Sequence, residues 1–442
     1  MKKVLILAYD LPPFVSVGGL RPYNWFKYMK DCGYEPIVVT RQWDEEYNGI
    51  ADYVTPSSTS KTVFEENGFG TIIKSPYFPN FPNRLYLKYG EHKFKLIRKV
   101  CSAFFEISQF LWITGPKKEI YKSANQYLKN NRVDIILATG DPFVLFHYAS
   151  LLSQQYKTPW IADYRDPWSF GLGMDKKIIY KRWSRFIEKK TLKTVSEITT
   201  VSNTFLNKIQ LLTDKKIHVI PNGYDPEIID NLELQNRTNK ILTIGFIGSM
   251  YKWNPVKQFL KILSTFVSQN GDDSIRLNMY GINNKKNVQK LIETKYTNLQ
   301  KVVTIYPRLP NDEVLAESSK SHVLLLFNYY AIIGTKIYDY MGMKIPILFC
   351  FSNDEITDNL RDKYKAMNDY SDQPFDAQQK LIEEKNAGII VENSIHLIKT
   401  LESLSSEFKE NGEIKCHSLD NQEFSRKRQT EKLSQIMNAL TN

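Results

Sequence analysis

Apolar runs of strand length alternate with helical patterns along most of the chain. In the first half, the apolar runs lie at 4–9, 36–40, 134–139, 159–163, 197–202 and 217–221. Apolar residues recur at helical spacing over 21–32, 143–155 and 175–195. Strands that alternate with helices predict a parallel sheet whose strands are joined by crossover helices.

The second half repeats this order. Its apolar runs lie at 242–248, 275–281, 302–306, 322–328, 345–350 and 387–393, and its helical patterns lie at 255–269, at 286–296 and from about 335. A chain of 442 residues is longer than one hydrophobic core normally serves. We therefore expect an α/β protein of two domains, each with a doubly wound parallel sheet.

Polar segments indicate where these domains begin and end. The segment 224–240 is polar and irregular, and we interpret it as a hinge between a first domain at 1–223 and a second domain at 241–420. The remaining segment, 421–442, has the pattern of a polar-rich helix that can pack back on the first domain.

Composition narrows the class of protein. Hydrophobic residues make up 42% of the chain and charged residues 24%, as in globular proteins. The longest later apolar stretch, 100–115, carries Glu106 and Gln109 and falls short of the ~20 apolar residues of a spanning helix. The four cysteines lie far apart without a C-x-x-C pair, which argues against a zinc site or a disulfide framework. We expect a cytoplasmic protein that has no metal and no other cofactor.

The net charge of +11 is concentrated in an insertion at about 80–130, which holds ten Lys or Arg residues and three Glu residues. Within it Phe94, Ile97 and Phe104 recur at helical spacing, and basic residues flank this stripe. Such a helix can lie on the anionic inner face of a membrane through residues 84–118. The alternative is a helix packed on its own domain with a solvated basic flank. No nucleic-acid reader motif accompanies the charge, so we expect no nucleic-acid partner.

Ligands of open parallel sheets bind beyond the carboxyl ends of the strands, so the loops there are candidate sites. In the first such loop, Gly18 and Gly19 precede a helix that Pro22 can open. Paired glycines let a backbone approach a phosphate. The spacing is not the G-x-G-x-x-G of dinucleotide sites, which argues against nicotinamide chemistry. A tight turn without a ligand is the alternative.

The loop after 159–163 brings together Asp163, Arg165, Asp166 and Trp168. Two carboxylates, a guanidinium and an aromatic ring suit the hydroxyl groups of a sugar. An Arg-Asp ion pair that braces the loop is the alternative. His147 lies within an apolar helix pattern, and we interpret it as a core histidine.

Two loops of the second half carry cations. Gly248, Ser249 and Lys252 follow a strand and precede a helix, so a phosphate there would meet backbone donors, a hydroxyl and an ammonium. Arg308 also follows a strand and can reach the same site.

A third loop leads to Lys336 and Asp339, which are three positions apart and therefore on one face of a helix. Lys336 adds positive charge to the start of that helix, and Asp339 can accept hydrogen bonds from the hydroxyls of a ribose. The alternative is an exposed ion pair worth ~0.2–0.5 kcal/mol. The position of the pair at a strand end, beside the other cationic loops, favours a binding site.

With these residues assembled, the chain resembles the family 4 glycosyltransferases. Their GT-B architecture has two Rossmann-like domains that face a central cleft. The matching segments follow the family's order over nearly the whole chain, and they are "PPFVSVGGLRP", "PWIADYRDPW", "TTVSNTF", "HVIPNGYDPE", "IGFIGS" and "GTKIYDYMGMKIPI".

The resemblance implies an acceptor site in the N-terminal domain and a sugar-nucleotide site in the C-terminal domain. It implies transfer with retention of the anomeric configuration and without a metal. By this resemblance Lys336 binds the diphosphate, Asp339 binds the ribose and Gly19 faces the diphosphate. Many members have a glutamate eight residues before the ribose-binding one, and this chain has Ala331 there.

The remaining roles are less specific. Lys252 and Arg308 are looser matches to cations of the donor site, and Asp163, Arg165 or Asp166 would orient substrates. The donor is expected to be a nucleotide sugar, with uridine before guanosine. The acceptor is expected to be a glycan or a lipid-linked molecule of polysaccharide or glycoconjugate biosynthesis. Two alternatives are a sugar-nucleotide 2-epimerase of the same fold and a non-catalytic subunit that binds sugar nucleotides.

Overall fold

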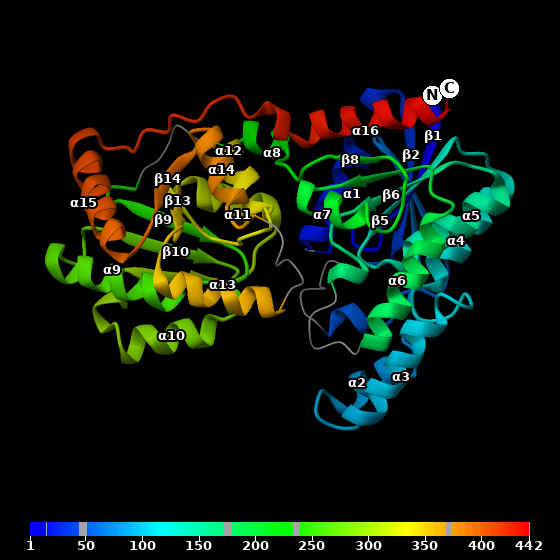
Figure 1. Ribbon diagram of the computed structural model, residues 1–442, viewed down its shortest axis with the longest axis horizontal. Coiled ribbons are helices and arrows are strands. Elements are labelled where there is room, and N and C mark those ends of the chain that lie inside the picture. Colours follow the sequence, from blue (N-terminus) through cyan, green and yellow to red (C-terminus); the bar gives the residue numbers. More distant parts are fainter. Residues whose placement is uncertain (15, 44–50, 172–177, 233–238, 368–373, 442) are drawn as a thin grey trace. The chain divides into compact units, whose positions relative to one another are not determined.

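The computed structural model describes residues 1–441, apart from 15, 44–50, 172–177, 233–238 and 368–373. The chain divides into two compact units (Figure 1). Unit 1 consists of Met1–Pro221 and Arg426–Asn442, and unit 2 consists of Asn222–Ser425.

Unit 1 is built on a mostly parallel sheet. Its strands are β1 (Lys2–Leu7), β2 (Tyr34–Arg41), β3 (Val63–Asn67), β4 (Gly70–Ser75), β5 (Ile135–Gly140), β6 (Trp160–Tyr164), β7 (Glu197–Thr200) and β8 (Ile217–Val219). Its helices are α1 (Val17–Tyr28), α2 (Phe81–Tyr89), α3 (Lys95–Ser108), α4 (Lys118–Asn130), α5 (Val144–Tyr156), α6 (Ile178–Leu192), α7 (Asn203–Ile209) and α16 (Arg426–Thr441).

The strand order of this sheet is β3-β4-β2-β1-β5-β6-β7-β8, and β3 alone among these strands runs antiparallel to its neighbour. From β4 to β7 the order is that of a doubly wound sheet whose direction of winding reverses between β1 and β5. Loops that follow β1 and β5 therefore diverge at this point and leave room for a ligand.

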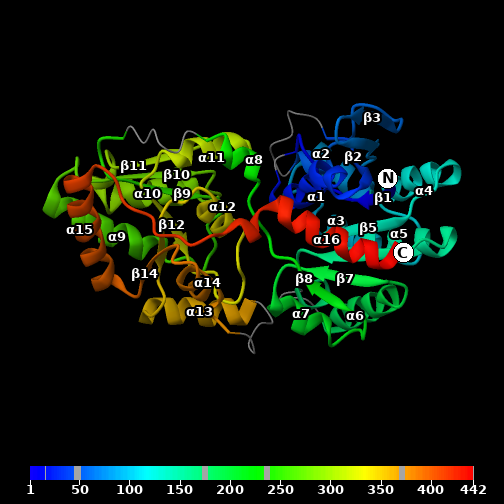
Figure 2. The same cartoon turned by 90° about the horizontal axis from the view of Figure 1, so that it is seen from above.

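Helix α16 belongs to unit 1 although it ends the chain. Its Leu433 and Met437 are fully buried against Trp25 of α1 and against Val4 and Ile6, which alternate along β1. Both views show α16, in red, beside α1 (Figures 1 and 2). A polar-rich helix holds its place there because its few apolar residues share one face.

Unit 2 repeats the doubly wound plan. Its strands are β9 (Thr243–Ile247), β10 (Arg276–Tyr280), β11 (Val303–Tyr306), β12 (Val323–Phe327), β13 (Ile347–Cys350) and β14 (Gly388–Val391). Its helices are α8 (Pro226–Asp230), α9 (Val256–Asn270), α10 (Lys285–Thr294), α11 (Asn311–Ser319), α12 (Lys336–Gly342), α13 (Glu355–Met367), α14 (Ala377–Glu384) and α15 (Ser394–Asn411). The strand order is β11-β10-β9-β12-β13-β14, with every pair parallel, and winding reverses between β9 and β12.

The strands of unit 2 are buried on both faces. Leu325 of β12 packs in one apolar cluster and the adjacent Leu324 and Leu326 in another. This explains why the strands read as continuous apolar runs in the sequence. The predicted fold class, two doubly wound α/β domains, is confirmed.

Several local features differ from the expectations. Helix α1 begins at Val17, so Gly18 and Gly19 lie in its first turn and not in a loop before it. The β3–β4 hairpin was not predicted. Part of the predicted hinge, 226–230, is helix α8 of unit 2. The hinge residues 233–238 and Asp175, where a helix was predicted to start, lie outside the described residues.

Candidate functional site

Two loops at the carboxyl edge of the second sheet are held together by tyrosine hydroxyls. The backbone N–H of Ile247, the last residue of β9, donates to the hydroxyl of Tyr340 in α12 at 3.1 Å. The hydroxyl of Tyr329, just after β12, donates to the carbonyl of Ser249 at 3.4 Å. The loops that follow β9 and β12 are therefore joined where the winding of the sheet reverses.

Lys336 and Asp339 lie at this junction. Lys336 Nζ is 3.3 Å from Asp339 Oδ2, and their side chains are 18% and 7% exposed. The pair is therefore not the exposed surface pair that was the alternative interpretation. A half-buried ammonium beside a buried carboxylate can bind a phosphate with the first group and a hydroxyl with the second.

Glycine is required at the end of β9. Gly248 has φ +106°, which side-chain-bearing residues rarely adopt, and no atom lies within 4 Å of the place where its Cβ would be. This open backbone allows a ligand to approach. Ser249 and Lys252 in the same loop are exposed, as is Arg308 after β11. The donor-binding role of Lys252 and Arg308 stays a prediction.

Aromatic rings line this loop. Tyr251 stacks on Trp253 with ring centroids 4.8 Å apart, and Tyr329 meets Tyr251 edge-on at 5.6 Å. These residues were not predicted, although a Tyr-x-Trp three positions after Gly248 was a visible signal. Ala331, where many family members have a glutamate, is 1% exposed.

The structure contradicts the predicted role of Asp163 in unit 1. Its side chain is completely buried and forms an ion pair with Arg21 of α1, whose Nη2 is 2.9 Å from Oδ1. The hydroxyls of Thr139 and Thr199 also donate to its carboxylate, at 2.9 and 2.8 Å. Because protein donors surround the carboxylate, Asp163 braces β5, β6, β7 and α1 and does not bind a substrate.

Arg165 and Asp166 remain at the surface of the site. Arg165 Nε donates to the carbonyl of Gly140 at 3.0 Å, and Nη2 donates to that of Asp141 at 2.5 Å. Arg165 is half-buried and Asp166 is exposed. The guanidinium thus links the carboxyl ends of β5 and β6 through hydrogen bonds to carbonyl groups. The sequence analysis had considered an Arg-Asp ion pair as the brace of this loop.

The two glycines of α1 serve close packing. A Cβ on Gly18 would lie 2.2 Å from Arg165 Nη1, and a Cβ on Gly19 would lie 3.2 Å from the backbone of Asp10. Ser16 caps the helix, with its Oγ accepting from the N–H of Gly18 at 3.1 Å. The expected phosphate contact of these glycines stays a prediction. The structure shows that each position also lacks room for a larger side chain.

Asp10 and Lys117 were missed by the sequence analysis. Asp10 follows β1, and its carboxylate accepts from Ser16 Oγ at 2.7 Å and from the Tyr53 hydroxyl at 3.3 Å. Lys117 precedes α4, and its ammonium lies 5.4 Å from the ring centre of Tyr9. Burial raises the pKa of Asp10 and lowers that of Lys117. The position of Asp10 after a strand was a signal that could have marked it as a site residue. No local sequence pattern marked Lys117.

Two titratable groups support the walls of unit 1. His147 is half-buried beside the Phe110 ring, and this partial burial lowers its pKa to about 4. Glu188 of α6 accepts from the Tyr164 hydroxyl at 2.9 Å and from the N–H of Ser169 at 3.0 Å. Burial raises the pKa of Glu188 to about 7. Glu188 therefore fixes the loop that carries Arg165.

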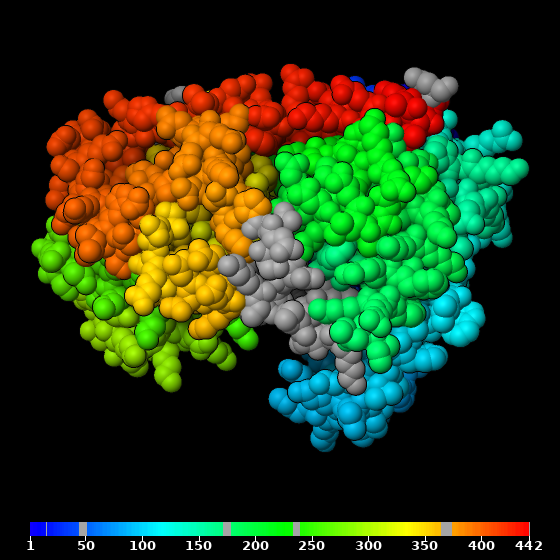
Figure 3. Space-filling view, in the orientation of Figure 1, coloured from blue at the N-terminus to red at the C-terminus, as the bar shows by residue number. Residues whose placement is uncertain are grey.

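The basic insertion exposes apolar side chains. Leu96, Val100 and Phe104 of α3 are 76%, 64% and 60% exposed, and Trp112 beyond its end is 61% exposed. Figure 3 shows α2 and α3, in cyan, projecting from unit 1. These exposed apolar side chains favour the membrane interpretation of the insertion, which stays a prediction. Among the described residues no helix is long and apolar enough to cross a membrane.

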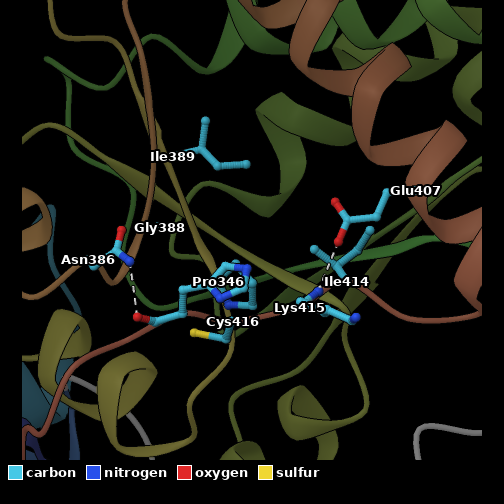
Figure 4. A pocket seen from close by; sticks show the side chains of 9 residues that line it. Pro346, Asn386, Gly388, Ile389, Glu407, Ile414, Lys415 and Cys416 are labelled. Atoms are coloured by element: carbon cyan, nitrogen blue, oxygen red, sulfur yellow. Dashed lines mark hydrogen bonds between the residues drawn. The ribbon is translucent and has the colours of Figure 1, made fainter.

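A pocket of about 200 Å³ in unit 2 lies away from these loops (Figure 4). It is lined by Pro346 and Gly388, which are at the amino ends of β13 and β14. Asn386 Nδ2 donates to the carbonyl of His417 at 3.1 Å across its wall. The described residues contain no group of three or more His, Cys, Asp or Glu residues placed to hold a metal ion.

Solved structures align with nearly the whole chain. Sucrose-phosphate synthase from Thermosynechococcus elongatus aligns with 100% of this chain and 96% of its own, with a TM-score of 0.55 and 11% identity. HepE from Anabaena, in complex with UDP and glucose, aligns with 99% and 100%, with a TM-score of 0.56 and 11% identity. An α,α-trehalose-phosphate synthase from Burkholderia xenovorans, in complex with glucose-6-phosphate, aligns with 100% of both chains, with a TM-score of 0.56 and 11% identity.

The two doubly wound units and these neighbours show the GT-B fold. The family described as Glycosyltransferase Family 4 matches residues 22–228. This match, which covers most of unit 1, agrees with the resemblance that the sequence motifs predicted. A search of curated protein sequences found no significant match.

Proposed function

We propose that the protein transfers a sugar from a nucleotide-sugar donor, with uridine as the favoured base, and that the product keeps the anomeric configuration of the donor. The observation that carries this proposal is the half-buried Lys336–Asp339 pair, 3.3 Å apart, at the reversal point of the second sheet. Ammonium and carboxylate there match the phosphate and the ribose of a nucleotide. HepE, a neighbour with the same fold, was solved with UDP and glucose.

The leaving group determines what the site must do. In the transfer, the bond from the sugar's anomeric carbon to the terminal phosphate oxygen breaks. A bond to the acceptor oxygen forms on the same face, and the acceptor's proton passes to the departing phosphate. Lys336 stabilises the charge that develops on this phosphate. Lys252, Arg308 and the backbone near Gly19 assist it, and neither a metal nor another cofactor takes part.

The acceptor binds to unit 1, where Arg165 and Asp166 orient it. Arg165 is held by carbonyls at the ends of β5 and β6, so its remaining N–H groups have a fixed direction. A guanidinium fixed in this way can donate to substrate oxygens with little loss of conformational entropy. Asp163 has no part in this step, because its carboxylate is buried against Arg21.

The exposed insertion supports an acceptor at a membrane surface. Leu96, Val100 and Phe104 offer apolar side chains for the headgroup region, and Arg98 and Lys99 are basic residues beside them. Helices of this kind bind anionic bilayers peripherally. The acceptor is accordingly a glycan or a lipid-linked molecule at the inner membrane face, in polysaccharide or glycoconjugate assembly.

Product analysis tests the transfer. UDP-sugars and GDP-sugars are incubated with the protein and with lipid-linked or free glycans, and the product linkage is read by NMR. Retention of the donor's configuration, unchanged by a chelator, supports the proposal, and inversion contradicts it. Conversion of the nucleotide sugar into an isomer without any acceptor would instead identify a 2-epimerase. Binding without transfer or hydrolysis would identify a non-catalytic subunit.

A further inference from the structure

A polar cluster at the carboxyl edge of the first sheet lies outside all predicted contacts. Its centre is Asp10, directly after β1, whose carboxylate accepts from Ser16 and Tyr53 at 2.7 and 3.3 Å. An ionised carboxylate has about four acceptor positions, so two remain for other donors. Asp10 is half-buried, and these two hydrogen bonds fix the direction of its free lone pairs.

Lys117 faces the same cluster from the basic insertion. Its ammonium lies over the Tyr9 ring at 5.4 Å, and among the described residues it has no hydrogen bond and no ion pair. Burial lowers the pKa of Lys117, whereas Asp141, Glu106 and Asp10 raise it through their charge. A half-buried ammonium without an acceptor is costly, and a ligand oxygen would remove this cost.

The charges around Asp10 and Lys117 are mixed. The groups within electrostatic range of the two residues are Asp141, Glu106, Arg41 and Arg165. Arg41 is already engaged, because its guanidinium donates to the carbonyls of Tyr53 and Thr55. Three carboxylates, including Asp10, therefore face three cations, including Lys117, and these groups provide no excess of positive charge.

This balance of charges favours a hydroxyl group over a phosphate as the ligand. A phosphate needs an excess of cations, and the carboxylates would repel it. A hydroxyl group both donates and accepts, so it can donate to Asp10 while it accepts from Lys117. Aromatic rings complete the site, because Phe14 stacks on Trp43 at 4.0 Å and both pack against Tyr53. Carboxylates, a cation and aromatic rings together are the surroundings of a neutral sugar.

We propose that Asp10 and Lys117 form a subsite of unit 1 that binds hydroxyl groups of a neutral sugar of the acceptor and disfavours a phosphorylated one. This inference rests on the proposed function, since it specifies the acceptor of that reaction. It separates the protein from the trehalose-phosphate synthase solved with glucose-6-phosphate, although the fold is shared.

Ligand-observed NMR of the full chain tests the subsite. The probes are the methyl α-glycosides of glucose, galactose and N-acetylglucosamine, compared with glucose 6-phosphate and glucose 1-phosphate, all in the presence of UDP. At least one neutral glycoside should bind more tightly than either phosphate. Asp10→Asn and Lys117→Met should each weaken that glycoside about tenfold, and Tyr53→Phe about threefold. Lys129→Met, at an exposed position in the last turn of α4, is the matched control and should bind as the parent does.

The titration of UDP separates this inference from the proposed function. The variants of unit 1 should keep the parent's UDP affinity within about twofold, because Lys336 and Asp339 lie in unit 2. Failure of the parent protein to bind UDP would contradict the proposed donor site. The glycoside measurements would still test the Asp10–Lys117 subsite. The inference is overturned if no glycoside binds, if Asp10→Asn and Lys117→Met retain glycoside affinity, or if a hexose phosphate binds best and Lys117→Met abolishes that preference.

Discussion

The guanidinium of Arg165 occupies the space that a side chain on Gly18 would need. The distance from Arg165 Nη1 to the Cβ position of Gly18 is 2.2 Å, and Arg165 at the same time donates to the carbonyls of Gly140 and Asp141. The first turn of α1 and the ends of β5 and β6 thus meet at one arginine. The contact with Arg165 favours glycine at position 18, whether or not Gly18 also contacts a phosphate.

Gly18→Ala should therefore reduce activity more than stability. The methyl group must displace the flexible Arg165 side chain, while alanine favours a helical position by ~0.5–1 kcal/mol over glycine. We expect a change in unfolding free energy below ~1 kcal/mol and a roughly tenfold fall in turnover, because charged hydrogen bonds of ~1.5–3 kcal/mol are misplaced. Gly68→Ala, with nothing within 4 Å of its Cβ position, is the control. Unchanged turnover of Gly18→Ala would contradict the positioning of substrate by Arg165.

Asp163→Asn should destabilise unit 1. The substitution leaves the guanidinium of Arg21 buried without a charge partner, which typically costs ~3–5 kcal/mol. Urea unfolding measures this loss. The matched control is Asp273→Asn, because Asp273 forms an exposed pair with Arg276 at 3.1 Å. Such a pair contributes ~0–1 kcal/mol. A variant of Asp163 with parental stability but no turnover would restore the substrate-binding role that we exclude.

Glu188 should make the stability of unit 1 depend on pH. Its pKa is raised by burial from an ordinary 4.5 to about 7, so the folded state holds the proton more tightly than the unfolded state. This contribution to stability is complete below about pH 4.5 and is lost as the pH rises through about 7. Its total is on the order of 3 kcal/mol.

Glu188→Gln tests this dependence. The amide mimics the protonated carboxyl, with its oxygen accepting from Ser169 and its NH₂ group donating to Tyr164. Unfolding free energies measured from about pH 5 to about pH 8 should fall less steeply for this variant than for the parent. Glu313→Gln, an exposed substitution in α11, should reproduce the parental slope. An equal slope for parent and Glu188→Gln would show that Glu188 does not titrate in this range.

The exposed face of α3 should bind anionic vesicles. Val100→Asp and Phe104→Asp, combined, should lower the vesicle-bound fraction strongly, because each apolar side chain contributes ~1.5–3 kcal/mol when buried. Flotation with phosphatidylglycerol vesicles measures the bound fraction. Ile395→Asp changes a residue that is 70% exposed in unit 2 and should have no effect. A parent protein that stays wholly in the soluble fraction would contradict a membrane surface as partner.

The alternation of apolar runs was sufficient to predict both sheets. Strands such as β12, buried on both faces, leave an unmistakable local pattern, and the loops that follow them could be searched in order. This is how Lys336 and Asp339 were found. Their separation of three residues placed them on one face of α12, and the structure gives the pair at 3.3 Å.

Contacts between distant segments could not be read in the same way. The partner of Asp163 is Arg21, 142 positions away, and no local pattern connects the two residues. Lys117 meets Tyr9 only because the insertion returns to the end of β1. The type of residue at a strand end can therefore be predicted from the sequence, whereas whether it faces a ligand or a buried partner depends on the tertiary fold.

The central claim is that unit 2 binds the nucleotide part of a sugar donor through Lys336. Isothermal titration of UDP into the parent, into Lys336→Ala and into Lys290→Ala tests it most directly, because Lys290 is an exposed lysine of α10. We predict that the parent and Lys290→Ala bind UDP equally and that Lys336→Ala binds at least ~10-fold more weakly, since a hydrogen bond to a charged group contributes ~1.5–3 kcal/mol. Equal affinity of Lys336→Ala and the parent would contradict the claim.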